Sequence, residues 1–270
     1  MRAGRRSGRR DGATAPYCAR TVFAMTAIAA LLLVLAAAAL PASAAAQAGT
    51  VASASRVEGS GRLIEDVRVL APFSALVVTG PIDVRLKRSG AERALVRADD
   101  NIAPLIETRV AGDRLTIGLR PGASFRTRSR LAIEVGFRQL SSLRVSGSGD
   151  LHIDRIEAPI VDVTIHGSGD VAIDRLEAEA LAVSIAGSGD VSVAGRATRL
   201  GVVIEGSGDL RADRLQAQQV AVRLRGSGDA RVLATESLQA DLAGSGDLRY
   251  RGAPALSKKV AGSGDVRPLR

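Results

Sequence analysis

The sequence has very little of several residue types that define common protein classes. Among its 270 residues there is one cysteine, no tryptophan and two histidines, and aromatic residues make up 2%. The only cysteine, Cys18, lies near the start of the chain, so the remainder can form neither disulfide bonds nor thiol-based active sites. So few aromatic residues suit a thin core of stacked aliphatic side chains.

Lysine is also scarce, although the chain is basic. The net charge is +9, and only three of the 37 basic residues are lysine (Lys87, Lys258 and Lys259). Residues 1–44 hold six arginines and one aspartate, which leaves 31 basic and 27 acidic residues in the rest of the chain. Aromatic residues do not alternate with a basic stripe, as single-strand binding surfaces require. We therefore expect no nucleic-acid partner.

Residues 1–44 have the pattern of a secretory signal peptide. An arginine-rich start is followed by an apolar run from Val22 to Leu40 and by the small residues of 41–44. We predict cleavage after Ala44, with Ala48 as the alternative, and an exported protein in the periplasm or on the cell surface. An uncleaved membrane anchor is the other interpretation, because the run is about long enough to span a bilayer. Residues 45–62 are small and polar, which predicts a flexible tether.

The tetrapeptide Gly-Ser-Gly-Asp occurs seven times in the second half of the chain. The copies start at Gly147, Gly167, Gly187, Gly206, Gly226, Gly244 and Gly262. Their spacings of 18 to 20 residues are typical of a stacked repeat protein, in which one repeat cannot bury its apolar face alone.

The residues around each copy alternate between apolar and polar. Val163–Ile165 and Val183–Ile185 precede a copy, and Val171–Ile173 and Val191–Val193 follow one. Alternating β-branched residues indicate strands. We therefore predict that residues 141–270 form an all-β, single-stranded parallel β-helix (β-solenoid) with about 20 residues per coil. A leucine-rich-repeat horseshoe is the alternative, but it needs an asparagine ladder and a helical return.

Stacking of the coils predicts aligned columns of side chains. Two apolar columns should fill the core: Val163, Val183, Val202 and Val222, and beside them Ile165, Ile185, Ile204 and Leu224. The tetrapeptide should form a sharp corner, because glycine adopts a positive φ without steric cost. Its Asp and Ser side chains can bond backbone amides nearby.

Residues 63–140 are rich in predicted strands but less regular. Gly80–Asp83 keeps the outer glycine and the aspartate of the tetrapeptide, and Val110–Leu119 has the pattern of a hairpin that turns at Gly112–Asp113. We expect this region to begin the same solenoid, with insertions, and to cap one end.

The aspartates of the seven copies should form a ladder with neighbours about 4.8 Å apart. Adjacent carboxylates then repel by roughly 1 kcal/mol even in water. Turn amides can relieve this repulsion, as can an arginine column two residues further on, at Arg211, Arg231, Arg249 and Arg267. The first three coils have His152, Ala172 and Ser192 there instead. Calcium is the remaining alternative, and Asp150, Asp170 and Asp190 would be its most favourable ligands.

Some parallel β-helices cleave polysaccharides with clustered carboxylates. His152 should lie near Asp150 and Asp170, and His166 should lie one coil from Ser146 and Ala186. The aspartates, however, recur with the corner in every coil, which indicates a structural role. The sequence has no nucleophile elbow, metal-ligand spacing or phosphate-binding loop. We predict no catalytic, cofactor-binding or metal-binding residues, no cofactor, and a protein that is not an enzyme.

The chain resembles the head GIN domain family of putative auto-transporter adhesins over about residues 57–267. The resemblance rests on Phe73–Gly80, Asp83–Leu86, Val110–Ile117, the seven tetrapeptides and Leu248–Gly252. It implies an exported bacterial protein with a β-helical fold. The chain ends directly after the last copy, so we expect it to contain no translocator of its own.

Three functional hypotheses follow. The first is a non-enzymatic protein of the cell envelope, an adhesin or binding scaffold that presents stacked side-chain ladders to an envelope glycan or a surface protein. The second is a carbohydrate-active β-helix enzyme. The third is a self-assembling module, because an open solenoid edge can pair with a second copy to form a homo-oligomer. In each case we expect membrane contact only through the N-terminal segment.

Overall fold

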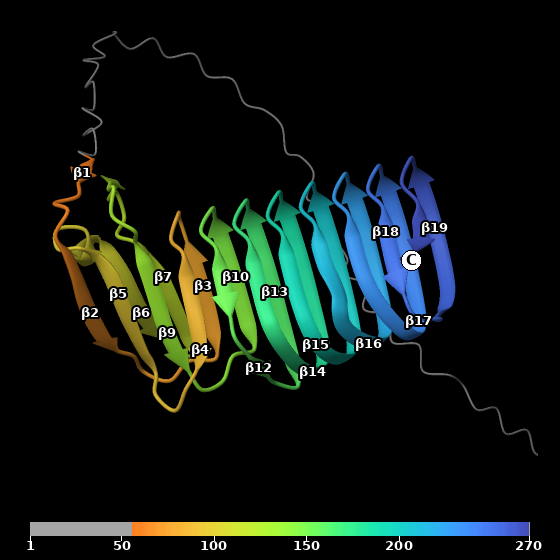
Figure 1. Ribbon diagram of the computed structural model, residues 1–270, viewed down its shortest axis with the longest axis horizontal. Coiled ribbons are helices and arrows are strands. Elements are labelled where there is room, and N and C mark those ends of the chain that lie inside the picture. Colours follow the sequence, from red (N-terminus) through yellow and green to blue (C-terminus); the bar gives the residue numbers. More distant parts are fainter. Residues whose placement is uncertain (1–55, 270) are drawn as a thin grey trace, which may run out of the picture. The chain divides into compact units, whose positions relative to one another are not determined.

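The computed structural model describes residues 56–269, which form β-strands and one short helical turn, η1 (Ala103–Leu105) (Figure 1). None of the helical structure in this range has the length and hydrophobicity needed to cross a membrane. The predicted signal peptide and residues 45–55 of the predicted tether lie outside the described residues.

The first part contains the strands β1 (Val57–Glu58), β2 (Leu63–Val69), β3 (Ala75–Thr79), β4 (Val84–Arg88), β5 (Arg93–Asp99), β6 (Ile106–Ala111), β7 (Arg114–Leu119), β8 (Phe125–Arg126) and β9 (Ala132–Phe137). The second contains β10 (Ser142–Gly147), β11 (Leu151–Ile153), β12 (Ile156–Glu157), β13 (Ile160–Gly167), β14 (Val171–Gly187), β15 (Val191–Gly206), β16 (Leu210–Gly226), β17 (Ala230–Gly244), β18 (Leu248–Arg251), β19 (Ala255–Gly262) and β20 (Val266–Pro268).

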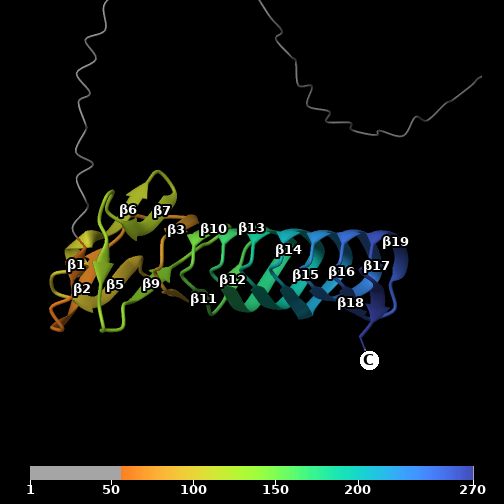
Figure 2. The same ribbon diagram turned by 90° about the horizontal axis from the view of Figure 1, so that it is seen from above.

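The second part is a β-solenoid of about six turns from residue 142 to residue 268, with coils of about 20 residues, which confirms the predicted fold. Strand β14 shows how one coil is built. Val171 and Ile173 point inward, the alternation slips where Asp174 and Arg175 are both exposed, and the inward pattern resumes at Leu176. Each slip turns the chain, so one long strand bends around the core between two tetrapeptide corners (Figure 2).

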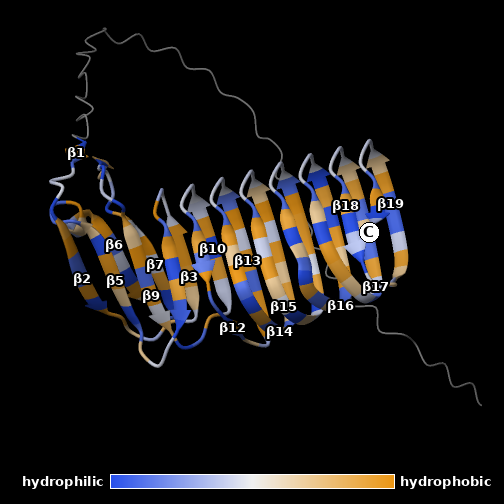
Figure 3. Ribbon diagram, in the orientation of Figure 1, coloured by the Kyte–Doolittle hydropathy of each residue, from blue (hydrophilic) through white to orange (hydrophobic). Residues whose placement is uncertain are grey.

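The coils stack in parallel and in register. Val163 aligns with Val183, and this column continues through Val202 to Val222. These side chains, and those of the neighbouring column that starts at Ile165, are at most 2% exposed. Both predicted columns are therefore confirmed, and the apolar residues alternate with polar ones along the strands (Figure 3). Stacked aliphatic side chains fill the core, as the near absence of aromatic residues requires.

The two glycines of each tetrapeptide are needed for different reasons. Gly187 has a φ of +134°, which side chains disfavour, and a Cβ there would lie 2.3 Å from the carbonyl oxygen of Gly167. The φ of Gly189 lies outside the region that side chains disfavour, but a Cβ there would lie 2.3 Å from the carbonyl oxygen of Gly169. The amides of Ser188 and Gly189 both donate to the Gly167 carbonyl, at 2.9 and 3.1 Å. The corners are thus packed backbone against backbone.

The first part continues the solenoid. Strands β3 and β4 pair in parallel with β10 and β11, although more than 60 residues separate them in sequence. Gly80 and Asp83 occupy the same corner as the tetrapeptides: the Gly80 amide donates to the Ser146 carbonyl at 2.9 Å. This corner is therefore an eighth member of the stack.

Antiparallel strands cap this end. Strand β7 pairs with β3, and β6 pairs antiparallel with β7 in the predicted hairpin. On the other side β9 pairs with β4, and β5 and β2 follow in antiparallel order. At the opposite end, all eight residues of β19 are exposed. The two ends of the solenoid therefore differ in construction.

Candidate functional site

The aspartates form the expected ladder, and each one bonds to the following coil. In every case Oδ1 accepts the backbone N–H of the next aspartate, at 2.8 to 3.1 Å; the donors are Asp150, Asp170, Asp190, Asp209, Asp229, Asp247 and Asp265. The first acceptor is Asp83, so the ladder begins in the irregular part. The predicted relief of repulsion by backbone amides is confirmed. The ladder joins successive coils and is part of the fold.

The predicted arginine column is present, since Arg211, Arg231, Arg249 and Arg267 are aligned on neighbouring strands. Arg211 lies 3.0 Å from Asp190, Arg249 lies 3.7 Å from Asp247, and Arg267 lies 2.6 Å from Asp265. Within residues 56–269, Arg231 has no such ion pair. The last aspartate has no further coil to bond. Its pKa lies below its ordinary value, first because of the Arg267 side chain and then because of the Val266 amide.

The two histidines have different surroundings. His166 aligns with Ser146 and Ala186, as expected, and its side chain is exposed. His152 lines the same depression as Asp150 and Asp170, but its Nε2 atom lies 3.0 Å from Asp174 Oδ2. The sequence analysis did not anticipate this partner, because Asp174 sits at the second corner of the next coil. No group of three or more potential metal-binding side chains occurs in the described part of the chain, and the calcium site stays a prediction.

A groove of about 680 Å³ lies over the sheet where the cap meets the first coils. The strands side by side in this sheet are β2, β5, β9, β4, β11 and the start of β14. We call this depression the N-terminal groove. Its acidic residues include Asp83, Asp150 and Asp170, its arginines are Arg85, Arg97 and Arg130, and its apolar residues include Leu63, Ile64 and Leu131.

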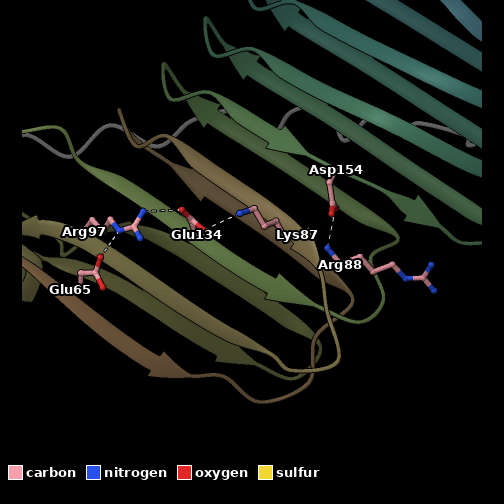
Figure 4. Close-up of polar contacts among 6 residues, drawn as sticks. All are labelled: Glu65, Lys87, Arg88, Arg97, Glu134 and Asp154. Carbon is pink, nitrogen blue, oxygen red and sulfur yellow. Dashed lines mark hydrogen bonds and ion pairs between the residues drawn. The ribbon is translucent and has the colours of Figure 1, made fainter.

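A chain of ion pairs crosses the strands of this sheet (Figure 4). Arg97 donates from Nε to Glu65 at 2.8 Å and from Nη1 to Glu134 at 3.0 Å, and Lys87 lies 3.4 Å from the other oxygen of Glu134. The pKa of Arg97 is raised, mainly by its hydrogen bond to Glu65. These four side chains come from β2, β5, β9 and β4, so the charges hold the strands of the cap together.

A second set of contacts joins the cap to the first coil. The Arg88 amide donates to Asp154 Oδ1 at 3.0 Å, as Figure 4 also shows. The Arg88 guanidinium pairs with Glu157, and this contact, followed by one from Arg155, lowers the pKa of Glu157. Of the charged residues that line the N-terminal groove, Arg97, Glu65 and Glu134 are therefore engaged with each other.

Arg85 and Arg130 are the exceptions. Neither forms an ion pair or a side-chain hydrogen bond with any residue from 56 to 269. Arg85 aligns with Glu134 on one side and His152 on the other, and both neighbours already have partners. Its side chain is exposed within the groove. It is therefore a donor available to a ligand.

The sequence analysis missed this groove. Its residues come from segments near 63, 83, 97, 130 and 150–172, which meet only in the folded sheet. The one available signal was the Gly80–Asp83 corner, which places Arg85 two residues beyond an aspartate, as in the arginine column. If Gly80–Asp83 is aligned with the tetrapeptides, Arg85 becomes the first residue of the row that contains the arginine column.

Solved structures with similar folds come from Bacteroides and Parabacteroides species. One from Bacteroides fragilis, called a "putative adhesin", is 26% identical with a TM-score of 0.74, and the match covers 79% of this chain and all of that one. A "putative lipid binding protein" from Parabacteroides distasonis is 25% identical with a TM-score of 0.67, covering 80% and 100%. A "putative adhesin" from the same species is 26% identical with a TM-score of 0.62, with the same coverage.

A search of curated proteins found no match. The family model described as "Putative auto-transporter adhesin, head GIN domain" matches residues 72–254. This range includes the corner at Gly80, the cap strands β3 to β9 and the tetrapeptides from Gly147 to Gly244. The chain therefore belongs to the head GIN domain family of putative auto-transporter adhesins.

Proposed function

We propose that this protein is an exported, non-enzymatic binding scaffold of the cell envelope, and that its ligand binds in the N-terminal groove. The family description and the adhesin names of two relatives support a binding role. The name of a third relative, a putative lipid binding protein, agrees with binding but suggests another ligand. The predicted signal peptide supports export.

The observation that carries the proposal is the groove itself. Its volume of about 680 Å³ lies within the range of small-molecule sites, roughly 300–1,000 Å³. Its base is a sheet whose coils are joined by the aspartate ladder, and ion pairs cross-link the strands of the cap. A site that is already ordered loses little conformational entropy when it binds.

The alternative is a carbohydrate-active enzyme. The groove contains carboxylates, but Asp83, Asp150 and Asp170 each use one oxygen to hold the amide of the next coil. The same bond recurs in coils far from the groove, as between Asp247 and Asp265. These carboxylates thus have a structural function that is independent of any reaction, which favours binding over catalysis.

The test is to block the groove at a position that tolerates a large side chain. Ala172 lines the groove, and later coils already have arginine at the equivalent position. Ala172→Arg should therefore fold normally and fill the groove. Ser192→Arg is the matched control, because Ser192 occupies the same row one coil further on and does not line the groove.

The purified protein and both variants would be immobilised and exposed to three ligand classes. These are neutral glucan and mannan oligomers, galacturonate oligomers, and vesicles of phosphatidylethanolamine and phosphatidylglycerol. We expect the wild type and Ser192→Arg to retain one class without creating new reducing ends, and Ala172→Arg to lose it. New reducing ends, no retention of any class, or equal retention by Ala172→Arg would each contradict the proposal.

Export has its own test. Intact cells that produce the protein would be treated with protease before and after the outer envelope is made permeable. Digestion in either sample indicates export, to the surface in the first case and to the periplasm in the second. Protection in both, with digestion only after lysis, would show that the protein stays inside the cell.

A further inference from the structure

We propose that the N-terminal groove takes a neutral, hydroxyl-rich ligand, such as a short glycan segment, and that Arg85 is its central hydrogen-bond donor. This inference rests on the proposed function, because it names the class of ligand for the same site. It depends on the charges that remain unpaired within the groove, on the position of its apolar residues, and on its rigid base.

The unpaired groups in the groove are of both signs. Asp83, Asp150 and Asp170 each commit Oδ1 to an amide and retain a second carboxylate oxygen. Arg85, two residues beyond Asp83 and beside the strand of Asp150, has no partner in residues 56–269. A hydroxyl group donates one hydrogen bond and accepts others, so it can bond a carboxylate and a guanidinium at once.

Other charged residues of the groove already have partners, so they do not change the sign of the charges available to a ligand. Arg97 is engaged by Glu65 and Glu134, and His152 is paired with Asp174. A polyanionic ligand would be attracted by Arg85 but would approach three carboxylates, whose repulsion is strong at a partly desolvated surface. A cationic ligand would be attracted by the carboxylates but repelled by Arg85 and Arg130. A neutral ligand with many hydroxyls satisfies both kinds of group.

The groove has apolar surface as well as polar groups, and its larger accessible apolar side chains come from β2 and from the residue before β9. Leu63 is 59% exposed, and Ile64 and Leu131 are partly buried beside the groove. Val84 and Leu151 belong to the same lining, but their side chains are buried in the core. The side chains that face outward along the base include Arg85, Glu134 and His152, which are polar. This arrangement fits the C–H face of a sugar ring against one wall better than it fits an acyl chain.

The same three ligand classes test the inference with two further variants. Arg85→Ala removes the proposed donor. Arg231→Ala is the control, because Arg231 lies in the same outer row of the sheet, also has no ion pair in the described chain, and does not line the groove. We expect retention of the neutral oligomers, a loss of about tenfold or more in Arg85→Ala, and no change in Arg231→Ala.

The outcomes separate the two proposals. Retention of galacturonate or of vesicles, abolished by Ala172→Arg, would overturn the ligand class and leave the binding function intact. Retention of neutral oligomers with equal strength by Arg85→Ala would overturn the role of Arg85. If Ala172→Arg has no effect, or if the oligomers are cleaved, the binding function itself fails.

A second inference concerns the opposite end of the solenoid, and it rests on Lys258. The register of β19 places Lys258 next to Ala240, at the end of the inward column that begins with Val163. Leu256 and Val260, the inward neighbours on the same strand, are each 39% exposed. Two of the three lysines in the chain, Lys258 and Lys259, lie on this one strand.

An inward-pointing lysine on an edge strand opposes pairing with another strand, because stacking would bury its charge. We infer that Lys258 prevents a second copy from stacking on β19. The alignment with an apolar column supports this role, since a valine here would extend that column to the open end. This inference differs from the third hypothesis of the sequence analysis, in which this edge promotes assembly.

The test is Lys258→Val, with Lys259→Val as the control on the outward side of the same strand. We expect light scattering over a concentration series to show a monomer for the wild type and for Lys259→Val, and concentration-dependent association for Lys258→Val. Circular dichroism would check that each variant keeps its β-structure. Association of the wild type, or a folded Lys258→Val that remains monomeric at high concentration, would overturn the inference.

Discussion

The strands from Ser142 onward and most of those up to Phe137 belong to one continuous hydrogen-bonded sheet, but they pair by different means. In the repeat, each coil pairs with residues 17 to 20 positions away, and all pairings are parallel. In the first part, strands far apart in the sequence meet, and the outermost pairs are antiparallel. The repeat thus supplies a regular frame, while the irregular part supplies a cap and most of the groove. Three predictions test this division.

The largest expected effect is at the repeat corners. Gly187→Ala should lower the free energy of unfolding by at least about 3 kcal/mol, because it combines a disfavoured φ with a clash against the neighbouring backbone. Gly61→Ala, with a φ of +76° and open space around it, should cost only about 1 kcal/mol. Urea denaturation compares the two. Similar losses would show that contact between coils does not constrain the corners.

The next effect concerns the ladder, which crosses the boundary between the two parts. Asp190→Ala leaves the Asp209 amide without its acceptor and should lower the free energy of unfolding by about 1–2 kcal/mol. Asp83→Ala should lower it by about the same amount, because the Asp150 amide then loses its acceptor. Asp190→Asn keeps an acceptor oxygen and should cost less than half as much. The measurement is again urea denaturation. A much smaller loss for Asp83→Ala would mean that the cap is joined to the repeat mainly by other contacts.

The smallest effect is a pH dependence at the buried Asp99 of the first part. Asp99 is 1% exposed, and the hydroxyl groups of Ser129 and Thr127 lower its pKa. A carboxyl group whose pKa is lower in the folded state stabilises the protein above its unfolded-state pKa, and that stability disappears as the pH falls through the folded value. As the pH falls below the ordinary carboxyl range, the β1–β8 pairing near Asp99 should therefore weaken.

Hydrogen exchange of the Val57 and Gly59 amides, which bond to the β8 segment, would follow this loss. The amide of Val183 in the repeat is the internal reference. Asp99→Asn should remove the acid-dependent step. The prediction is wrong if the repeat amide loses protection over the same pH range as the two cap amides.

The repeat could be predicted almost entirely from the sequence, because its interactions recur at a fixed spacing. The columns through Val183 and Ile185, the corners and the arginine row all follow from that period. The position of β3 and β4 followed from one degenerate corner, Gly80–Asp83. The partner of His152 and the contacts of Arg97 did not follow, because they depend on how non-repeating segments fold back on the sheet.

The role of the second glycine was also missed. Positive φ explains Gly187, but Gly189 is required because the backbone of the preceding coil, at Gly169, passes too close for any side chain. Such proximity is a property of two stacked coils, and no single repeat reveals it. The contribution of serine also differs from the expectation that its hydroxyl bonds the backbone. Ser188 is exposed, and its backbone amide bonds the preceding coil.

The ladder makes each coil depend only on its immediate neighbours. An internal duplication of one period, 18 to 20 residues, would present the same donors and acceptors on both sides. It would move the far end outward by about 4.8 Å and leave the groove unchanged. Evolution could therefore adjust how far the molecule extends by copying or deleting units, without altering what it recognises.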